Sequence, residues 1–229
     1  MSAKFDEYKD SYREEVERSI SFAGADLDVF TQAKATALLR LVRRRLGDPG
    51  TVRALDVGCG AGETDRHLVS ELREIHGVDV SPEILETARA ENPSVTYSAY
   101  DGERLPYEDG EFDLAFAICV VHHVPPPQWP SFARELARVV RPGGLVTVIE
   151  HNPLNPLTRL AVARCAFDDD AVLLGAPRAA RLLAEAGVDD VHSEYIVFHP
   201  FRRPALRELE HHLRRLPLGA QYVTAGRRR

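Results

Sequence analysis

From residue 51 onward, short runs rich in β-branched residues alternate with helical patterns along the chain. This alternation is typical of βαβ units, in which parallel strands form one sheet and helices cover its faces. The expected strands lie near 52–57, 74–80, 94–99, 112–121 and 144–150. The expected helices between them lie near 62–72, 81–91 and 128–141. The sequence therefore predicts an α/β fold built on a mostly parallel sheet.

The segments on either side of this alternation predict further elements. Two helices are expected before the sheet, near 3–20 and 27–46, and together they would form a helical cap over residues 1–48. The last third predicts, in order, a helix stopped by Gly187, a strand near 191–200, a charged helix near 204–216 and a strand near 219–226. No convincing linker interrupts the chain. The chain is therefore expected to form one domain, which consists of the cap at residues 1–48 and the sheet-bearing part at residues 49–229.

Two local motifs predict where helices begin and end. Ser81 can cap the helix near 81–91, and Pro82 suits its first turn. Arg141 to Gly144 reads as a turn before the fifth strand.

Composition narrows the classes of protein to which the chain can belong. A length of 229 residues suits one well-cored domain, and the net charge of -6 argues against a general nucleic-acid binder. No apolar run reaches the ~20 residues that a membrane helix needs. The polar start and three scattered cysteines favour a cytoplasmic protein. The segment from Pro200 to Arg229 contains eight arginines and two glutamates, so it is basic. It is either a solvated surface or a contact for an anionic substrate or partner.

A glycine-rich loop follows the first expected strand. In "ALDVGCGAGE", Ala54 to Glu63, the glycines Gly58, Gly60 and Gly62 allow a tight turn and a close approach to a ligand. The second expected strand ends at Asp79, about 20 residues later, where an acidic residue can bind ribose hydroxyls.

The residues around this loop indicate which kind of nucleotide ligand it can bind. A dinucleotide-binding loop would have its third glycine at position 63, where this chain has Glu63, and a carboxylate there would repel a pyrophosphate. A phosphate-binding P-loop is excluded because no Lys-Ser or Lys-Thr pair follows. The ligand should therefore have ribose hydroxyls and no phosphate, a description that S-adenosylmethionine fits.

These motifs resemble those of the class I S-adenosylmethionine-dependent methyltransferases. The resemblance lies in "LDVGCGAGE", "GVDVSPEIL", "AYDGERLPYEDGEFDLAFAICVVHHV" and "RPGGLVTVIEHN", and it covers residues 51–151 well. It implies a Rossmann-like domain with a seven-stranded, mostly parallel sheet whose last strand is antiparallel. The chain also resembles a bacterial subgroup with a Leu-Gly-Ala-Gln-Tyr-like final strand, here 218–222, which often accompanies glycan or secondary-metabolite biosynthesis.

The same resemblance implies roles for individual residues. Gly58 and Gly60 would lie against the methionine portion, with Asp56 near its amino group. Asp79 would bind the ribose hydroxyls, and Asp101, with the amide of Gly102, would bind the adenine. The other positions implied for the cofactor site are Gly62, Val80 and Cys119. Asp79 could instead cap the following helix, and Asp101-Gly102 could form only a turn.

Polar residues follow the fourth and fifth expected strands. They are His122, His123, Glu150, His151 and Asn152. In open α/β sheets, ligands bind at the carboxyl ends of the strands, so these residues predict the acceptor site. The Asn-Pro steps of "IEHNPLNPLTR" would hold the following loop extended over it.

Histidine suits the removal of a proton from an oxygen acceptor. His123 is the first choice for the base, followed by His151 and then His122; a purely structural histidine is the alternative. Because adjacent strand residues face opposite ways, His122 and His123 are expected to differ in role. Glu150 could orient His151 or pair with an arginine.

Two further groups complete the expected site. Tyr8 and Tyr12 lie four residues apart on one helix face, and in similar proteins such a segment covers the cofactor; plain packing is the alternative. Three consecutive acids in "FDDDA", Phe167 to Ala171, could bind Mg²⁺, but acids in the first turn of a helix account for them better. No metal is therefore expected.

The sequence thus predicts a methyltransferase that acts on a small molecule, with an oxygen acceptor favoured over nitrogen or carbon. An enzyme that uses S-adenosylmethionine in a cyclisation or elimination without methyl transfer is the alternative, and a non-catalytic binding partner is a third class. Motifs for methylation of exocyclic amines or of cytosine are absent from the sequence. Neither a nucleic-acid nor a membrane partner is expected, and a homo-oligomeric state is left open.

Overall fold

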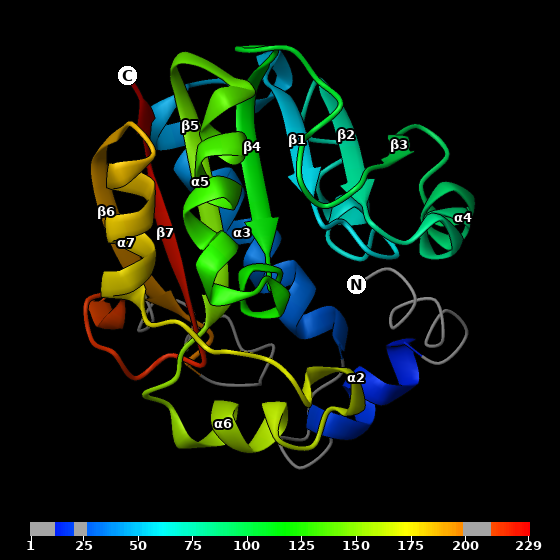
Figure 1. The fold of residues 1–229 in the computed structure, drawn as a ribbon, viewed down its shortest axis with the longest axis vertical. Helices are drawn as coiled ribbons and strands as arrows, with labels where there is room; N and C mark the ends of the chain where they lie inside the picture. The colour runs from blue at the N-terminus through cyan, green and yellow to red at the C-terminus, as the bar shows by residue number, and fades with distance from the viewer. Residues whose placement is uncertain (1–11, 21–26, 199–211) are drawn as a thin grey trace.

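Seven strands form one sheet in the computed structural model, which describes residues 12–20, 27–198 and 212–229 (Figure 1). The strands are β1 (Arg53–Val57), β2 (Glu74–Asp79), β3 (Thr96–Ala99), β4 (Phe112–Ile118), β5 (Val140–His151), β6 (Val188–Ile196) and β7 (Gln221–Arg228). Their order across the sheet is β3-β2-β1-β4-β5-β7-β6. Only β7 runs antiparallel to its neighbours, β5 and β6. The mostly parallel sheet with an antiparallel last strand is confirmed.

Helices cover both faces of this sheet. They are α2 (Tyr12–Ile20), α3 (Leu27–Arg45), α4 (Pro82–Glu91), α5 (Trp129–Arg138), α6 (Pro156–Val162) and α7 (Ala176–Glu185). The apolar residues of α3 and α4 pack on one face of the sheet, and those of α5 and α7 pack on the other. Helices α2 and α6 lie below the carboxyl ends of the parallel strands in the view of Figure 1. Within the described residues, no helix combines the length and the apolar character that crossing a bilayer requires.

The two-sided core follows from the strand sequences. In β4, Leu114 and Phe116 join the cluster on the α3 side, whereas Ala115 and Ala117 join the cluster on the α5 side. Successive strand residues point to opposite faces, so a continuous apolar run makes both faces hydrophobic. Such a strand is stable only when helices cover both sides.

Of the two local motifs predicted for the ends of helices, the first is confirmed and the second is wrong. The Ser81 hydroxyl accepts a hydrogen bond from the Ile84 amide, and Pro82 opens α4, as expected. Arg141 to Gly144 was expected to form a turn before the fifth strand, but it lies within β5, with Gly143 at a φ of +76°.

Two elements of the central region differ from expectation. Residues 62–72 do not form an α-helix: their hydrogen bonds mix three- and four-residue spacings around the short 3-10 helix η3 (Asp65–His67). The fourth strand ends at Ile118 because Cys119 adopts a φ of +58°, a left-handed conformation that ends an extended run. The chain then forms another 3-10 helix, η4 (Val121–His123).

The flanking elements agree where they are described. The second N-terminal helix, α7 before Gly187 and the final strand are confirmed. The sixth strand starts earlier than expected, at Val188, and bends at a register shift between Asp189 and His192. The first part of the expected helix 3–20 lies outside the described residues. The same holds for the expected helix 204–216 up to residue 211, and the chain turns at 214–218.

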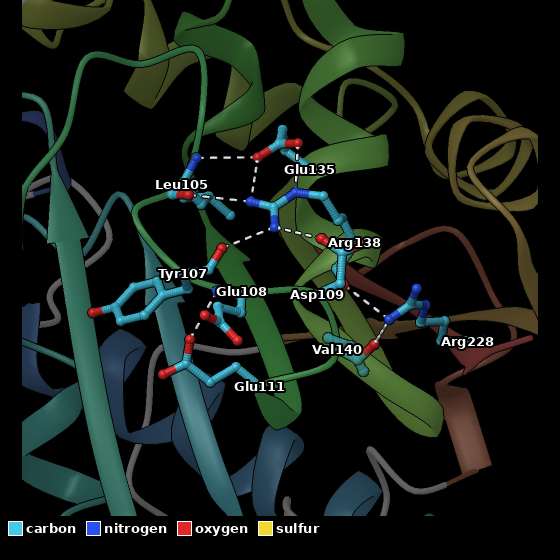
Figure 2. A network of polar contacts seen from close by, with 9 residues as sticks. All are labelled: Leu105, Tyr107, Glu108, Asp109, Glu111, Glu135, Arg138, Val140 and Arg228. Carbon is cyan, nitrogen blue, oxygen red and sulfur yellow. Dashed lines mark hydrogen bonds and ion pairs between the residues drawn. The ribbon is translucent and has the colours of Figure 1, made fainter.

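The loop between β3 and β4 is fixed to α5 by Arg138, the last residue of that helix (Figure 2). Its guanidinium donates to the carbonyl oxygens of Leu105 and Tyr107 at 3.1 and 2.8 Å. It also pairs with Glu135 and Asp109, and these carboxylates raise its pKa. The Glu135 carboxylate accepts from the Leu105 amide at 3.1 Å. One arginine thus holds the loop that follows Asp101 and Gly102.

Candidate cofactor and acceptor site

A pocket lies at the carboxyl ends of the parallel strands. Its lining comes from the ends of β1, β2, β4 and β5 and from the loops after β1 to β4. Helices α2, α3, α4 and α6 and the segment after α6 supply the rest. The residues predicted for the site that line it are Asp56, Gly58, Gly60, Asp79, Val80, Gly102, Cys119, His122, His123 and His151. This placement is the one expected for an open α/β sheet.

The glycine loop forms the floor of the pocket. The amides of Gly58 and Cys59 donate to the Val78 carbonyl at 2.7 and 3.1 Å, which ties the loop to β2. Gly60 has a φ of +53°, and a Cβ there would meet nothing closer than 3.9 Å, so a side chain would enter the space of the pocket. Gly62 is different, because a Cβ there would lie 2.5 Å from Asn92. It allows packing beneath the loop and does not line the pocket.

Asp79 joins the loop to the following helix. One carboxylate oxygen accepts from the Gly60 amide at 2.9 Å, and the other accepts from the Ser81 amide at 3.0 Å. These contacts fix the carboxylate at the edge of the pocket.

Asp56 and Asp65 form a buried acid pair below the glycine loop. Their Oδ1 atoms are buried and have no hydrogen-bond donor among the described N–H and O–H groups. Burial and the neighbouring Asp65 raise the pKa of Asp56 well above its ordinary value. Burial raises the pKa of Asp65 to about 6, although the Tyr97 hydroxyl donates to Oδ2 of Asp65 at 2.7 Å. The pair is therefore most stable when Asp56 keeps a proton and shares it with Asp65.

Lys34 brings a positive charge to this acidic pocket. It extends from α3, is 8% exposed and lines the pocket near Asp56. Burial works to raise the pKa of the Cys119 thiol, but Lys34 and His151 outweigh it and lower this pKa to about 7. Sequence reasoning missed Lys34, because it lies on α3, before the strands whose ends form the pocket, and nothing in the pattern of that helix points to the pocket.

Asp101 turns toward its own backbone. Its Oδ1 accepts from the amides of Glu103 and Arg104 at 2.8 and 2.9 Å, and these bonds lower its pKa. The side chain is exposed and does not line the pocket, whereas Gly102 does. The turn that the sequence offered as an alternative is therefore present.

His122 is clamped between two carboxylates. Its Nδ1 lies 2.6 Å from Oε2 of Glu150, and its Nε2 lies 3.6 Å from Oδ1 of Asp168. The other oxygen of Glu150 accepts from the amides of Val120 and Val121 at 3.0 and 2.7 Å. Glu150 thus orients His122. Among the described residues, it neither bonds to His151 nor pairs with an arginine, the two roles expected for it. It is buried away from the pocket.

His122 and His123 do not diverge as expected. They lie on η4 and not on a strand, so their rings are only 4.1 Å apart, and Nε2 of His123 is 3.3 Å from Oδ1 of Asp168. The ring of His151 is 5.0 Å from that of His122. Three histidines therefore gather at one place.

The charges around this cluster are unequal. Burial acts to lower the pKa of His122, but Glu150 and Asp168 outweigh it and raise this pKa to about 10. Burial and the neighbouring His122 lower the pKa of His123 to about 4. His122 is thus an imidazolium and His123 a neutral ring when no other cation is bound.

Residues 54–144 match the family model of the methyltransferase domain. The match begins in β1 and extends into β5, so it contains the glycine loop, Asp79 and both histidines of η4. The matched residues thus form a methyltransferase domain.

Curated relatives of this methyltransferase domain are similar over part of their length. An uncharacterized methyltransferase of Synechocystis is 34% identical over 104 residues, which is 45% of this chain and 49% of the relative. The 2-methyl-6-phytyl-1,4-hydroquinone methyltransferase of Synechocystis is 34% identical over 108 residues, 45% of this chain and 33% of the relative. The chain thus spans half or less of the length of these curated relatives.

Solved structures agree with the fold of the methyltransferase domain over nearly the whole chain. A methyltransferase of Thermotoga maritima, described as a possible histamine N-methyltransferase, has a TM-score of 0.72 at 19% identity and covers 100% of both chains. Phosphoethanolamine N-methyltransferase 2 of Haemonchus contortus, in complex with S-adenosyl-L-methionine, has a TM-score of 0.60 at 19% identity. The alignment covers 95% of this chain and 60% of that one.

The pocket of the methyltransferase domain fits this cofactor in three respects. The missing side chain at Gly60 leaves room above the loop. The carboxylate of Asp79 lies at the end of β2, where ribose hydroxyls would be bound. A zwitterionic methionine portion carries both charges, and Lys34 and the buried Asp56 offer partners for both.

The remaining expectations had mixed outcomes. Asn152 is buried and donates to the Pro217 and Gly219 carbonyls, so it holds a loop and does not face the pocket. Tyr8 and the Tyr12 side chain lie outside the described part of the chain. The acids of 168–170 do not begin an α-helix: Asp168 ends the 3-10 helix η6 (Ala166–Asp168), and its carboxylate points at the histidines. The sequence shows the run of acids, but it does not reveal that the Asp168 carboxylate points at the histidines.

Proposed function

We propose that this protein transfers a methyl group to an oxygen of a small-molecule acceptor. The observation that carries the proposal is that the glycine loop, Asp79 and a histidine cluster line one and the same pocket. When bound, S-adenosylmethionine supplies an electrophilic methyl group on a sulfonium and leaves as the neutral thioether. Positioning the acceptor beside that methyl group accounts for much of the rate enhancement in such displacements.

The cofactor roles proposed for the chain follow the lining of the pocket. The backbone at Gly58 and Gly60 would hold the methionine portion, with Asp56 near its ammonium group and Lys34 near its carboxylate. Asp79 would bind the ribose hydroxyls. Gly102 lies where the adenine would bind, and Asp101 would support that segment through its turn.

The acceptor would be held between two adjoining hollows. The second hollow is lined mainly by apolar side chains, among them Ile20, Phe30, Leu157 and Val197. His151 lines both hollows. An acceptor with an apolar body and one reactive hydroxyl group would fill this arrangement.

His151 would take the proton from the acceptor. The sequence ranks His123 first, but Asp168 already contacts Nε2 of His123, and His122 is clamped by Glu150. As the acceptor oxygen bonds to the methyl carbon, the C–S electron pair stays on sulfur and the hydroxyl proton moves to His151. Helix α2 contributes Val16, Ser19 and Ile20 to the lining, which supports the proposal that the N-terminal cap covers the site.

The setting that we propose is bacterial secondary-metabolite or glycan biosynthesis in the cytoplasm. Cys59, Cys119 and Cys165 are all free thiols, which fits a reducing compartment.

Calorimetric titration with S-adenosylhomocysteine tests the cofactor site. We expect a Kd near 1 μM, about -8 kcal/mol, for the wild-type protein and for Glu83→Gln, an exposed change on α4. Asp79→Ala should lose binding, and NAD should not bind. Absence of binding by folded wild-type protein would overturn the proposal.

Mass spectrometry of products then tests the reaction. Panels of apolar alcohols and phenols should yield products that carry one added methyl group. His151→Gln should lower kcat while leaving the affinity for S-adenosylhomocysteine unchanged. A product without added methyl would identify the cyclisation or elimination that is the alternative, and methylated amines alone would overturn the oxygen preference.

A further inference from the structure

Three ligating atoms meet at the end of the acceptor site. They are one ring nitrogen of His122, one ring nitrogen of His123 and a carboxylate oxygen of Asp168, and all lie within 4.8 Å of one another. The histidines come from η4, whereas Asp168 comes from η6, more than forty residues later. The fold therefore brings together two segments that have no sequence motif in common.

The spacing of these atoms matches the edges of a metal coordination shell. Oδ1 of Asp168 lies 3.3 Å from Nε2 of His123 and 3.6 Å from Nε2 of His122. Around Zn²⁺, with ligand bonds of about 2.0–2.2 Å, tetrahedral geometry separates neighbouring ligand atoms by about 3.4 Å. Two imidazoles and one carboxylate, with a fourth position open, are a common ligand set for catalytic zinc.

Glu150 completes the arrangement from behind. It binds Nδ1 of His122 at 2.6 Å, which leaves Nε2 directed at Asp168. The amides of Val120 and Val121 hold Glu150 in turn. A carboxylate on the far nitrogen is the usual support of a metal-bound histidine, because it fixes the ring and raises its basicity.

Burial and charge support a cation at this point. Oδ1 of Asp168 is buried and accepts no well-formed hydrogen bond from the described residues, and Asp168 is 8% exposed. Glu150 and Asp168 bring two carboxylates to this buried point, and a divalent cation balances their negative charge. His123 and Asp168 both line the pocket, so an ion can enter from it.

We propose that His122, His123 and Asp168 form a binding site for a divalent transition metal ion, with Zn²⁺ the best match to their nitrogen and oxygen ligands. Its open position faces the acceptor site. There the ion would hold the acceptor oxygen and stabilise its negative charge, a role that rests on the proposed methyl transfer. Metal binding itself does not depend on that function.

Metal titration of protein without an affinity tag provides the test. Protein stripped with a chelator is titrated with Zn²⁺ in competition with a chromophoric chelator, and separately with Co²⁺, whose visible spectrum reports the coordination geometry. We expect one ion per chain and visible bands of four- or five-coordinate Co²⁺. If the folded wild-type protein binds neither ion, or binds them with the spectrum of hydrated Co²⁺, the proposal is overturned.

Variants assign the ligands. Asp168→Asn and His123→Gln should each weaken Zn²⁺ binding by at least about tenfold, and Glu150→Gln by about ten- to a hundredfold. Asp169→Asn, a change of the exposed neighbouring acid, should bind as the wild type does. Equal affinity of Asp168→Asn, His123→Gln and wild type would overturn the assignment.

A second measurement on the same samples separates this site from the cofactor site. S-adenosylhomocysteine should bind to Asp168→Asn as it does to the wild type, which also shows that the variant is folded. If S-adenosylhomocysteine does not bind to the wild type while Zn²⁺ does, the proposed function fails and the metal site stands. If S-adenosylhomocysteine binds to the wild type while Zn²⁺ does not, only the proposed metal site fails.

Discussion

The absence of a side chain at Gly60 shapes the cofactor pocket. Its backbone amide donates to Asp79, and its Cα faces the open space above the loop. One position thus serves both the polar contact at the floor of the pocket and the room above it.

We predict that Gly60→Ala reduces the affinity for S-adenosylhomocysteine much more than it reduces stability. The added methyl group enters the pocket, whereas the left-handed backbone adds a strain of about 1 kcal/mol. Calorimetry and urea unfolding measure the two effects. Gly47→Ala, at another positive φ with nothing within 4 Å, is the matched control and should cost stability alone. If Gly60→Ala and Gly47→Ala bind S-adenosylhomocysteine with equal affinity, the predicted role of Gly60 in the pocket is wrong.

The Asp56–Asp65 pair predicts a pH dependence of stability. A carboxyl group whose pKa is raised on folding contributes stability at low pH and loses it as the pH rises through the folded pKa. For Asp65, with its pKa raised from 3.8 to about 6, the loss falls between about pH 4 and 6 and amounts to at most about 3 kcal/mol. Asp56, Asp79, Lys34 and Cys59 face the same space and modulate it.

Asp65→Asn should therefore flatten the stability profile between pH 4 and 7 while keeping an oxygen for the Tyr97 hydroxyl. Urea unfolding at a series of pH values measures this. We expect the variant to be at least as stable as the wild type at pH 7. Parallel profiles for the two proteins would show that Asp65 does not titrate in this range.

At the scale of elements, the strands were predictable and the connections at the site were not. The runs that became β1 and β4 are mainly apolar and are flanked by polar residues, so local pattern alone indicates them. The positive φ of Cys119 and the 3-10 turn of η4 depend on tertiary contacts of Glu150 and Val121, which no local pattern reveals. For that reason the glycine loop and Asp79 were placed correctly, whereas the pairing of His122 with Glu150 and the direction of Asp168 were not.

We predict that the loop before β4 loosens when Arg138 is changed. Arg138→Ala removes the donors to the Leu105 and Tyr107 carbonyls and leaves Glu135 with the Leu105 amide but without its arginine partner, so it should lower the free energy of unfolding by about 2–3 kcal/mol. Arg134→Ala, on the exposed side of the same helix, should change it by less than about 0.5 kcal/mol. Thermal unfolding measures both. Similar losses in the two variants would contradict the role of the network in Figure 2.

At the scale of the whole molecule, the pocket joins parts of the chain that are far apart. Helix α2, the glycine loop and the segment around Cys165 all contribute to its lining, whereas α7 lies on the other side of the sheet from α3. A ligand bound in the pocket contacts these parts of the chain but does not contact α7.

Hydrogen exchange should show this division. S-adenosylhomocysteine should slow amide exchange in α2, in the glycine loop and around η6, with little change in α7. At a hundred times its Kd, the ligand should also add about 2.7 kcal/mol of stability. Mass-spectrometric exchange with and without ligand measures the pattern. Uniform slowing across α7 and α2 alike would indicate global stabilisation and not a closing of the cap.

The position of β7 between β5 and β6 has a consequence for synthesis. Among the described strands, β6 pairs with β7 alone, and β5 pairs with β4 on one edge and with β7 on the other. The second edge of β5 is therefore unpaired until β7 has been made. The end of β7 at Arg228 follows the end of β5 at His151 by 77 residues. At about 5–20 residues per second the ribosome therefore needs roughly 4 to 15 seconds to supply the strand that covers the edge of β5. During that interval the nascent chain exposes an apolar strand edge, Leu145 to Ile149, to other chains. The yield of folded protein should therefore depend on how quickly the last strand leaves the ribosome and on chaperones that cover this edge until then.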